Sequence, residues 1–163
     1  MITSAKTARN ILPAIFRKVD KVVGWQTGDR NIDYGGGPYS KLTMALADKG
    51  VDNLVYDPHH KSAEHNLEVL MSCNLNPADT ATLSNVLNVI PNLKVRLEVI
   101  REVKSLLSDG GMLFVTVYEG DRSGKGKKTR DGWQENRRLN TYRKELSRVF
   151  DTVRLVNGLL ICY

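Results

Sequence analysis

The sequence predicts an α/β protein with one mostly parallel β-sheet, helices on both faces and an antiparallel hairpin at the C-terminal end. Two observations carry this prediction. Short apolar segments that are typical of buried strands alternate with helical repeats along most of the 163 residues, an order that favours a parallel sheet. Near the end of the chain, Asn157-Gly158 separates two apolar runs, which is the pattern of a two-residue hairpin turn.

Length and composition favour an ordinary globular protein. A single domain over residues 1–163 is expected, because one domain usually has about 100–150 residues. The chain has 41% hydrophobic and 26% charged residues, which argues against intrinsic disorder. The apolar run 11–16 is too short to span a membrane, so no membrane partner is expected. Cys73 and Cys162 stand apart, so no disulfide framework is expected and a cytoplasmic location is the default.

The first half of the chain opens with a helix. Apolar residues from Leu12 to Val22 recur at helical spacing and predict a helix over about residues 12–24, with Pro13 in its first turn. The elements that follow are, in chain order, a strand at 31–33, a helix that begins after Ser40 and ends at Gly50, a strand at 53–56 and a helix at 62–72.

The second half completes the sheet. A nearly continuous apolar run at 80–90 is typical of a central strand that is buried on both faces. After it come a helix that ends at Gly110-Gly111, a strand at 112–118, a helix over 139–149 and two hairpin strands at 152–156 and 159–163. Between residues 57 and 80 the chain has room for one further strand, but no segment there has the pattern of one. We therefore expect six or seven strands, with the third strand absent or very short.

Positive charge gathers in one stretch, the basic loop at 120–138. It holds seven basic and three acidic residues, which supply +4 of the formal net charge of +6. One interpretation is a solvated loop that aids solubility. The other is a surface that follows the phosphates of a nucleic acid. Composition alone leaves both open.

A glycine turn follows the first strand, at the end of a parallel sheet where ligands usually bind. Gly35-Gly36-Gly37 lets a ligand approach the main chain, and Asp57 ends the next strand, where a carboxylate can accept hydrogen bonds from ribose hydroxyls. The pair predicts a cofactor that contains a nucleoside, although a tight turn beside a capping Asp is the structural alternative. Ser40 stands where a dinucleotide fingerprint has its third glycine, and Asp33 before the turn suits a cationic ligand such as S-adenosylmethionine.

Here the sequence resembles the class I S-adenosylmethionine-dependent methyltransferases, a Rossmann-like family. The segments that carry the resemblance are Asp33-Tyr34-Gly35-Gly36-Gly37 for the acidic-x-Gly-x-Gly motif, Asp57 for the ribose-binding acid, Ser84-Asn85-Val86-Leu87-Asn88 for the end of the fourth strand, Gly110-Gly111 before the fifth strand, and the Asn-Gly hairpin for the antiparallel seventh strand. The sequence also resembles, more narrowly, the small bacterial and phage methyltransferases of this family, through Asp57-Pro58, the run 86–90 and Arg96.

The resemblance implies S-adenosylmethionine as the cofactor and a site at the first strand ends. By this resemblance the residues that contact it are Asp33, Tyr34, Gly35, Gly36, Gly37, Asp57, Pro58, Ser84 and Asn85. Ser84 and Asn85 would also face the methyl group, and Tyr118 at the end of the fifth strand is a further catalytic candidate. Val86 and Leu87 replace the Pro-Pro-aromatic segment of the DNA amino-methyltransferases, so the acceptor atom stays open.

The favoured acceptor at this point is a nucleic acid, DNA or RNA. The expected contacts are Arg122, Lys125, Lys127, Lys128, Arg130 and Trp133, since an aromatic ring beside basic residues can stack an unpaired base. A small-molecule methyltransferase and a cofactor-binding protein without transfer activity are the alternatives. His59, His60 and His65 lack zinc-type spacing with a cysteine, so no metal is expected. A homo-oligomer or a partner subunit that recognises the target also fits the small size.

Overall fold

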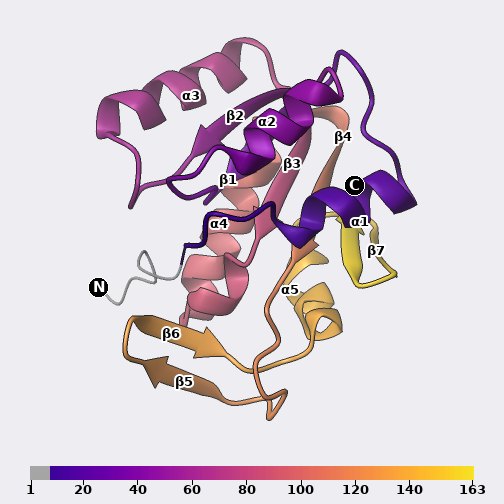
Figure 1. Cartoon of the computed structure of the whole chain (residues 1–163). Helices are drawn as coiled ribbons and strands as arrows, with labels where there is room; N and C mark the ends of the chain where they lie inside the picture. Colours follow the sequence, from indigo (N-terminus) through magenta and orange to yellow (C-terminus); the bar gives the residue numbers. More distant parts are fainter. Residues whose placement is uncertain (1–7) are drawn as a thin grey trace.

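The computed structural model describes residues 8–163, so residues 1–7 of the expected domain lie outside the described part. Its centre is a six-stranded sheet in the order β2-β1-β3-β4-β8-β7, and a separate two-stranded sheet pairs β5 with β6 (Figure 1). The strands are β1 (Arg30–Tyr34), β2 (Asp52–Tyr56), β3 (Ala78–Ser84), β4 (Leu107–Thr116), β5 (Gly126–Thr129), β6 (Gly132–Glu135), β7 (Val153–Val156) and β8 (Leu159–Cys162). The helices are α1 (Ala14–Val22), α2 (Lys41–Asp48), α3 (Ala63–Leu75), α4 (Leu93–Leu106) and α5 (Arg143–Leu146), with the 3-10 turns η2 (Leu87–Val89) and η3 (Leu139–Tyr142).

The predicted fold class is confirmed. Strands β2, β1, β3 and β4 run parallel, and β8 joins β4 in the antiparallel direction. The Asn157-Gly158 turn connects β7 to β8, as the sequence predicts, with both residues at positive φ. The third strand, which we expected to be absent or very short, is absent within residues 8–163, where β2 forms the edge of the sheet. Helix α3 lies in the chain between β2 and β3. Ser62 caps the N-terminus of this helix, where its hydroxyl oxygen accepts a hydrogen bond from the His65 N–H at 3.1 Å.

Two apolar cores fix the helices on opposite faces of the sheet. On one face α1 and α2 bury Ile15, Val19 and Leu46 against Phe114 of β4. On the other face α3, α4 and α5 pack on the sheet around a larger cluster that includes Ile100. The strand ends that carry the predicted site are therefore held between two packed layers, as in other three-layer α/β proteins.

Several predicted boundaries are wrong, for local reasons. The run at 80–90 does not form one strand, because β3 ends at Ser84 and Asn85 adopts a left-handed φ of 58° that turns the chain. The helix predicted over 139–149 is only the short pair η3 and α5. Pro13 precedes α1 as its N-cap instead of lying in the first turn.

The basic loop at 120–138 is not an irregular loop. Its middle forms the β5–β6 hairpin, in which Lys128 lies opposite Trp133 and Lys127 lies opposite Gln134. The hairpin lies below the sheet, beyond the carboxyl ends of the strands (Figure 1). None of the helices within residues 8–163 combines the length and the hydrophobicity of a membrane span.

Candidate functional site

The glycine turn lies where three strands end together. The Gly35 N–H donates to Tyr56 O at 2.7 Å, which joins the end of β1 to the end of β2. A Cβ atom at Gly35 would lie 2.6 Å from Cγ2 of Val86, so the turn also packs against the chain that leaves β3. Gly35 and Gly37 have φ values of 79° and 74°, a left-handed conformation that favours glycine. The structure therefore brings together the predicted segments at 35–37, 57 and 84–86.

Gly36 is needed for a different reason. A Cβ atom there would lie 2.3 Å from Oδ2 of Asp33 and 2.8 Å from Cγ1 of Val55, so no side chain fits between the turn and that carboxylate. Asp33 is 4% exposed, and its Oδ1 accepts a hydrogen bond from Thr82 Oγ1 at 2.8 Å. Burial raises the pKa of Asp33 to about 6; the Thr82 hydroxyl opposes this shift, and the nearby Asp57 adds to it. An acid of this kind beneath a glycine turn is a counter-charge for a cationic ligand.

Asp57 directly follows β2 and organises the turn with its carboxylate. Its Oδ2 accepts a hydrogen bond from the Gly37 N–H at 2.8 Å and lies 3.2 Å from Nδ1 of His60. Its Oδ1 accepts from the N–H groups of His59 and His60 at 2.8 and 3.0 Å. Burial alone would raise the pKa of Asp57, but the N–H groups of His59 and Gly37 and the His60 side chain outweigh it, so the pKa lies below its ordinary value.

These contacts test whether the site suits the expected cofactor. The glycine turn fits, because it offers close approach to the main chain over a buried acid. Asp57 lies at the expected strand end, but its two oxygens already accept from three backbone N–H groups and face His60. A carboxylate has about four lone-pair positions. A ribose hydroxyl can therefore bind Asp57 by replacing His60, whose side chain is the one movable partner among these four.

The other predicted cofactor contacts divide into two groups. Tyr34 is 6% exposed, stacks on Tyr56 with ring centroids 4.5 Å apart, and donates its hydroxyl to Glu102 at 2.5 Å. Its side chain is thus part of the core, and only its backbone can line the site. Pro58, by contrast, is exposed beside Asp57.

Ser84 and Asn85 lie at the end of β3, beside the end of β4. The Asn85 N–H donates to Thr116 O at 2.9 Å, while its side chain is exposed and has no hydrogen-bond partner within residues 8–163. A non-glycine residue at positive φ is uncommon, and such residues often occur at functional sites. The exposed Asn85 amide is therefore free to contact a reacting group.

A segment that sequence reasoning missed also borders the turn. A Cβ atom at Gly37 would lie 3.7 Å from Cβ of Ala8, so the chain before α1 approaches the glycine turn. Figure 1 shows this segment, in indigo, running past the carboxyl ends of the strands toward α1. No sequence pattern indicates this contact, because it depends on where α1 docks.

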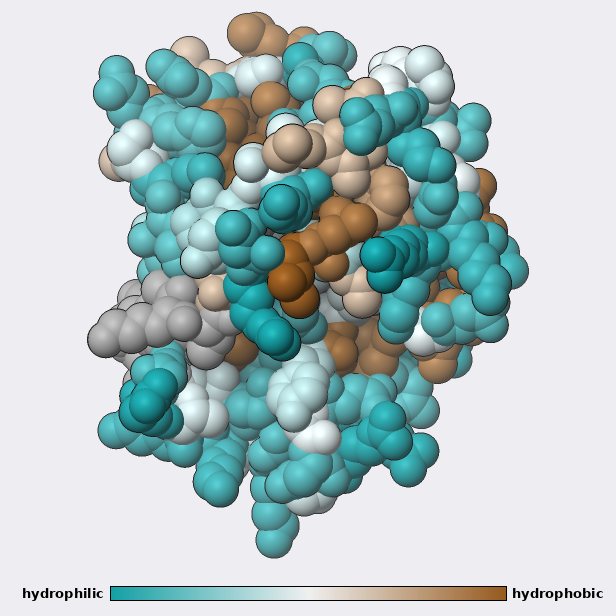
Figure 2. Space-filling model, in the orientation of Figure 1, coloured by the Kyte–Doolittle hydropathy of each residue, from teal (hydrophilic) through white to brown (hydrophobic). Residues whose placement is uncertain are grey.

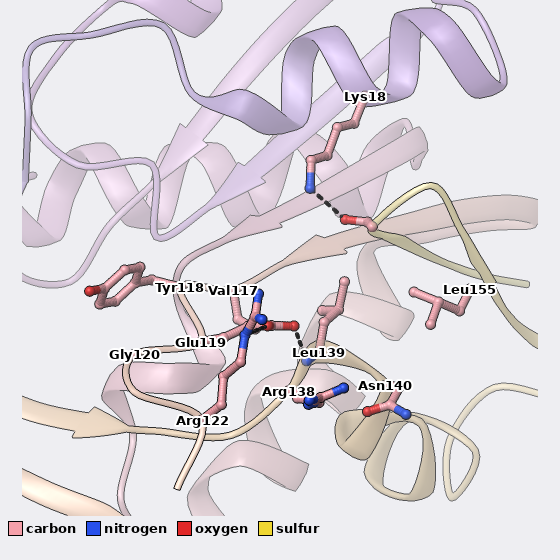
Figure 3. Close-up of a pocket in the computed structure, with 11 residues that line it drawn as sticks. Lys18, Val117, Tyr118, Glu119, Gly120, Arg122, Arg138, Leu139, Asn140 and Leu155 are labelled. Atoms are coloured by element: carbon pink, nitrogen blue, oxygen red, sulfur yellow. Dashed lines mark hydrogen bonds and ion pairs between the residues drawn. The ribbon is translucent and has the colours of Figure 1, made fainter. Parts of the chain in front are cut away.

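A hollow of about 800 Å³ opens at the end of β4, on the side of β8 (Figure 3). Its walls come from four separate parts of the chain: Lys18; Val117, Tyr118, Glu119, Gly120 and Arg122; Arg138, Leu139 and Asn140; and Leu155 and Gly158. Tyr118 is 64% exposed and points away from the other lining residues (Figure 3). The size suits a small organic molecule.

The predicted nucleic-acid contacts are only partly available. Arg122 pairs with Glu119 at 2.7 Å and Arg130 pairs with Asp131 at 3.1 Å. Trp133 is half-buried and lies across its own hairpin, because a Cβ atom at Gly126 would be 2.1 Å from its ring. The exposed lysines of the hairpin are Lys125, Lys127 and Lys128. Figure 2 shows the lower part of this face, where the hairpin lies, as mainly hydrophilic.

A buried ion network holds the hairpin in place. Arg96 of α4 is 5% exposed, and its Nε donates a hydrogen bond to Glu145 at 2.8 Å. Its Nη1 donates to Ile90 O at 2.6 Å and lies 3.6 Å from the carboxylate of Glu135 in β6. Glu145 also pairs with Arg137, just after β6. Within the described residues, no group of three or more His, Cys, Asp or Glu side chains could hold a metal ion.

Comparisons with known proteins show the family and the fold of the chain. A family model described as "Methyltransferase domain" matches residues 7–154. No curated protein matches the chain in a sequence search. Among solved structures, a Burkholderia thailandensis 1,6-didemethyltoxoflavin-N1-methyltransferase with bound S-adenosylhomocysteine is 13% identical, with a TM-score of 0.64 over 92% of this chain and 77% of that one.

Two further structures are similar in fold. A TehB-like S-adenosylmethionine-dependent methyltransferase from Corynebacterium glutamicum is 15% identical, with a TM-score of 0.55 over 97% of this chain and 89% of that one. The pyocyanin biosynthetic protein PhzM is 12% identical, with a TM-score of 0.58 over 91% of this chain and 53% of that one. The chain thus spans about half the length of PhzM. It belongs to the methyltransferase domain family and has the fold of the class I methyltransferases.

Proposed function

We propose that the protein transfers a methyl group to a small molecule that binds in the hollow at the end of β4. The observation that carries the proposal is the position of this hollow. Asn85 donates its N–H to Thr116, and the chain that follows Thr116 forms the wall from Val117 to Gly120. The predicted methyl-facing residue and the hollow are therefore neighbours along two adjacent strand ends.

S-adenosylmethionine supplies an activated methyl group on its sulfonium when it is bound. The chain's own residues bind and align the reactants, which accounts for a large part of catalysis in displacements of this kind. Asp33 provides a negative charge beneath the glycine turn. The Asn85 amide oxygen can accept a hydrogen bond from an acceptor N–H or O–H and so orient its lone pair toward the methyl group.

Similar proteins support a small acceptor. One neighbour is a 1,6-didemethyltoxoflavin-N1-methyltransferase and another is a mitomycin 7-O-methyltransferase. Sequence identities of 13% and 16% carry the fold alone, so the acceptor of this chain has to be found by experiment.

A block of the hollow tests the proposal. Leu155 is 41% exposed and lines the hollow, so Leu155→Trp should fill part of it. Leu75→Trp, at a position that is 87% exposed on α3, is the matched control. We expect formation of S-adenosylhomocysteine from a metabolite extract to fall at least tenfold in Leu155→Trp and to stay unchanged in Leu75→Trp. Equal activity in both variants would refute the hollow as the acceptor site.

A nucleic acid is the second candidate, and the exposed hairpin lysines favour it. Lys125, Lys127 and Lys128 have no acidic partner within 4 Å in the described part of the chain. If they contact the phosphates of a single strand, replacing all three with Gln should reduce the slope of log affinity against log salt by about two. Binding to a single-stranded oligonucleotide that is unchanged in the triple variant would exclude this role. Retained cofactor binding without turnover on any acceptor would favour a binding protein without transfer activity.

A further inference from the structure

The hollow at the end of β4 has an excess of positive charge. Its charged lining residues are Lys18 of α1, Arg122, Arg138 and one acid, Glu119. All other lining residues are uncharged, so the formal charge of the walls is +2, from three cations and one anion. The three cations come from separate parts of the chain, and only folding brings them to one opening.

Glu119 pairs with only one of these cations, and both of its carboxylate oxygens are already occupied. Its Oε1 accepts a hydrogen bond from the Leu139 N–H at 2.8 Å and its Oε2 pairs with Arg122 Nε at 2.7 Å. The Leu139 N–H is the main cause that holds the pKa of Glu119 below its ordinary value, and Arg122 and Arg138 add to this effect. Glu119 therefore stays ionised and fixes Arg122 at the wall of the hollow (Figure 3).

The cations keep donors for a ligand. Lys18 Nζ donates to Gly158 O at 2.7 Å, which places the ammonium at the rim and leaves its other two N–H groups. Arg122 uses only Nε in its pair with Glu119. The Arg138 guanidinium is exposed and makes no hydrogen bond with residues 8–163.

The rest of the wall is partly apolar. Val117, Leu139 and Leu155 line the hollow between the cations. A ligand that matches both features has an anionic group and an apolar body. Guanidinium and ammonium groups bind carboxylates and phosphates through charge-assisted hydrogen bonds, which are stronger than hydrogen bonds between neutral groups.

We propose that the hollow recognises a small organic anion, a carboxylate or a phosphate ester on an apolar body, and that the methyl acceptor belongs to this class. The second part rests on the proposed function. Lys18 and Arg138 are the residues that select the anion and position it, and they take no part in the transfer itself. Asp33 and the glycine turn lie at other strand ends, so binding of the anion is separable from binding of the cofactor.

Two matched ligands test the charge requirement without any measurement of activity. The protein is titrated with benzoate and with benzamide, which have the same ring with and without the negative charge, and 1H–15N NMR spectra report the contact. Phenyl phosphate is a third ligand that separates carboxylate from phosphate preference. We expect benzoate or phenyl phosphate to shift the amide signals of Gly120, Leu139 and Gly158, and benzamide to shift them much less.

Variants then test the residues. Lys18→Met and Arg138→Gln should each weaken binding of the preferred anion by about tenfold, the usual loss when a hydrogen bond to a charged group is removed. Arg148→Gln removes one positive charge outside the hollow and should leave the Kd unchanged. Because the two substitutions are tested singly, failure of one variant to fold still leaves the other measurement.

Three results would overturn the proposal: equal binding of benzoate and benzamide, anion binding that both variants retain, or shifts at these amides only with a short oligonucleotide. Calorimetry with S-adenosylhomocysteine on the same sample keeps the two ideas apart. Cofactor binding without anion preference would remove this inference alone. Anion binding without cofactor binding would remove the proposed function and leave the anion site in place.

Discussion

Asp33 offers a test in which stability and cofactor binding should change in opposite directions. The side chain is 4% exposed beneath the glycine turn, and burial raises its pKa from 3.8 to about 6. Since the unfolded chain loses this proton at a lower pH than the folded chain, the free energy of unfolding falls as the pH rises from about 4 to about 6. The ionised group therefore destabilises the protein at neutral pH.

The size of the effect follows from the shift. A change from 3.8 to about 6 is about two units, which corresponds to about 3 kcal/mol at pH 7, since each unit is worth about 1.4 kcal/mol. Asp33→Asn removes the charge and keeps an oxygen that can accept the Thr82 hydroxyl. We expect the stability of the variant relative to the natural protein to rise by about 2 kcal/mol between pH 4 and pH 7, because a small part of the effect is already present at pH 4.

Urea denaturation at a series of pH values, followed by the fluorescence of the buried Trp25, measures this difference. Asp48→Asn is the control, because it removes a carboxylate from an exposed position of α2. The same Asp33→Asn variant should bind S-adenosylhomocysteine more weakly, since the amino group of the ligand loses its counter-charge. A stability difference that stays constant from pH 4 to pH 7 would refute the buried-charge reasoning.

Three further expectations concern the site and its support. Gly36→Ala should greatly reduce calorimetric affinity for S-adenosylhomocysteine, because its Cβ would meet Asp33 at 2.3 Å, whereas Gly124→Ala in open space should not. Asp57→Ala should cost about 2 kcal/mol or more at pH 7, since three backbone N–H groups lose their acceptor. Because the pKa of Asp57 is lowered, that cost should shrink as the pH falls below about 4, which acid-series urea curves would reveal. Arg96→Met should lower stability by about 2–3 kcal/mol in thermal denaturation, because the buried Glu145 loses Arg96 and keeps only Arg137. A loss below 1 kcal/mol would contradict a buried network.

The sheet and the glycine turn could be predicted because their signals are local in sequence. Apolar strands, helical repeats and the Asn157-Gly158 turn each occupy one short segment, and pairing of parallel strands brings their ends together. Asp57 could be placed at its strand end for the same reason. Its contacts with Gly37 and His60 could not, because they depend on how the turn folds back across β2.

The acceptor side could not be predicted because its residues are distant in sequence. Lys18, Arg122 and Leu155 line one hollow only because β8 lies beside β4 and α1 covers that edge. The hairpin within the basic stretch at 120–138 could not be predicted either, because the stretch stands out in the sequence only by its charge. The hairpin is held instead by Trp133 packing on Gly126 and by buried ion pairs that no composition count reveals.

Cofactor binding remains the most direct test of the whole account. Calorimetric titration of the natural protein with S-adenosylmethionine and S-adenosylhomocysteine, with NAD and ATP as controls, should give selective binding in the micromolar range. The enthalpy measured in buffers of different ionisation enthalpy should also reveal proton release near pH 6, because the bound amino group favours ionised Asp33. Absence of binding to both compounds would contradict the assignment of the glycine turn and Asp33 as the cofactor site.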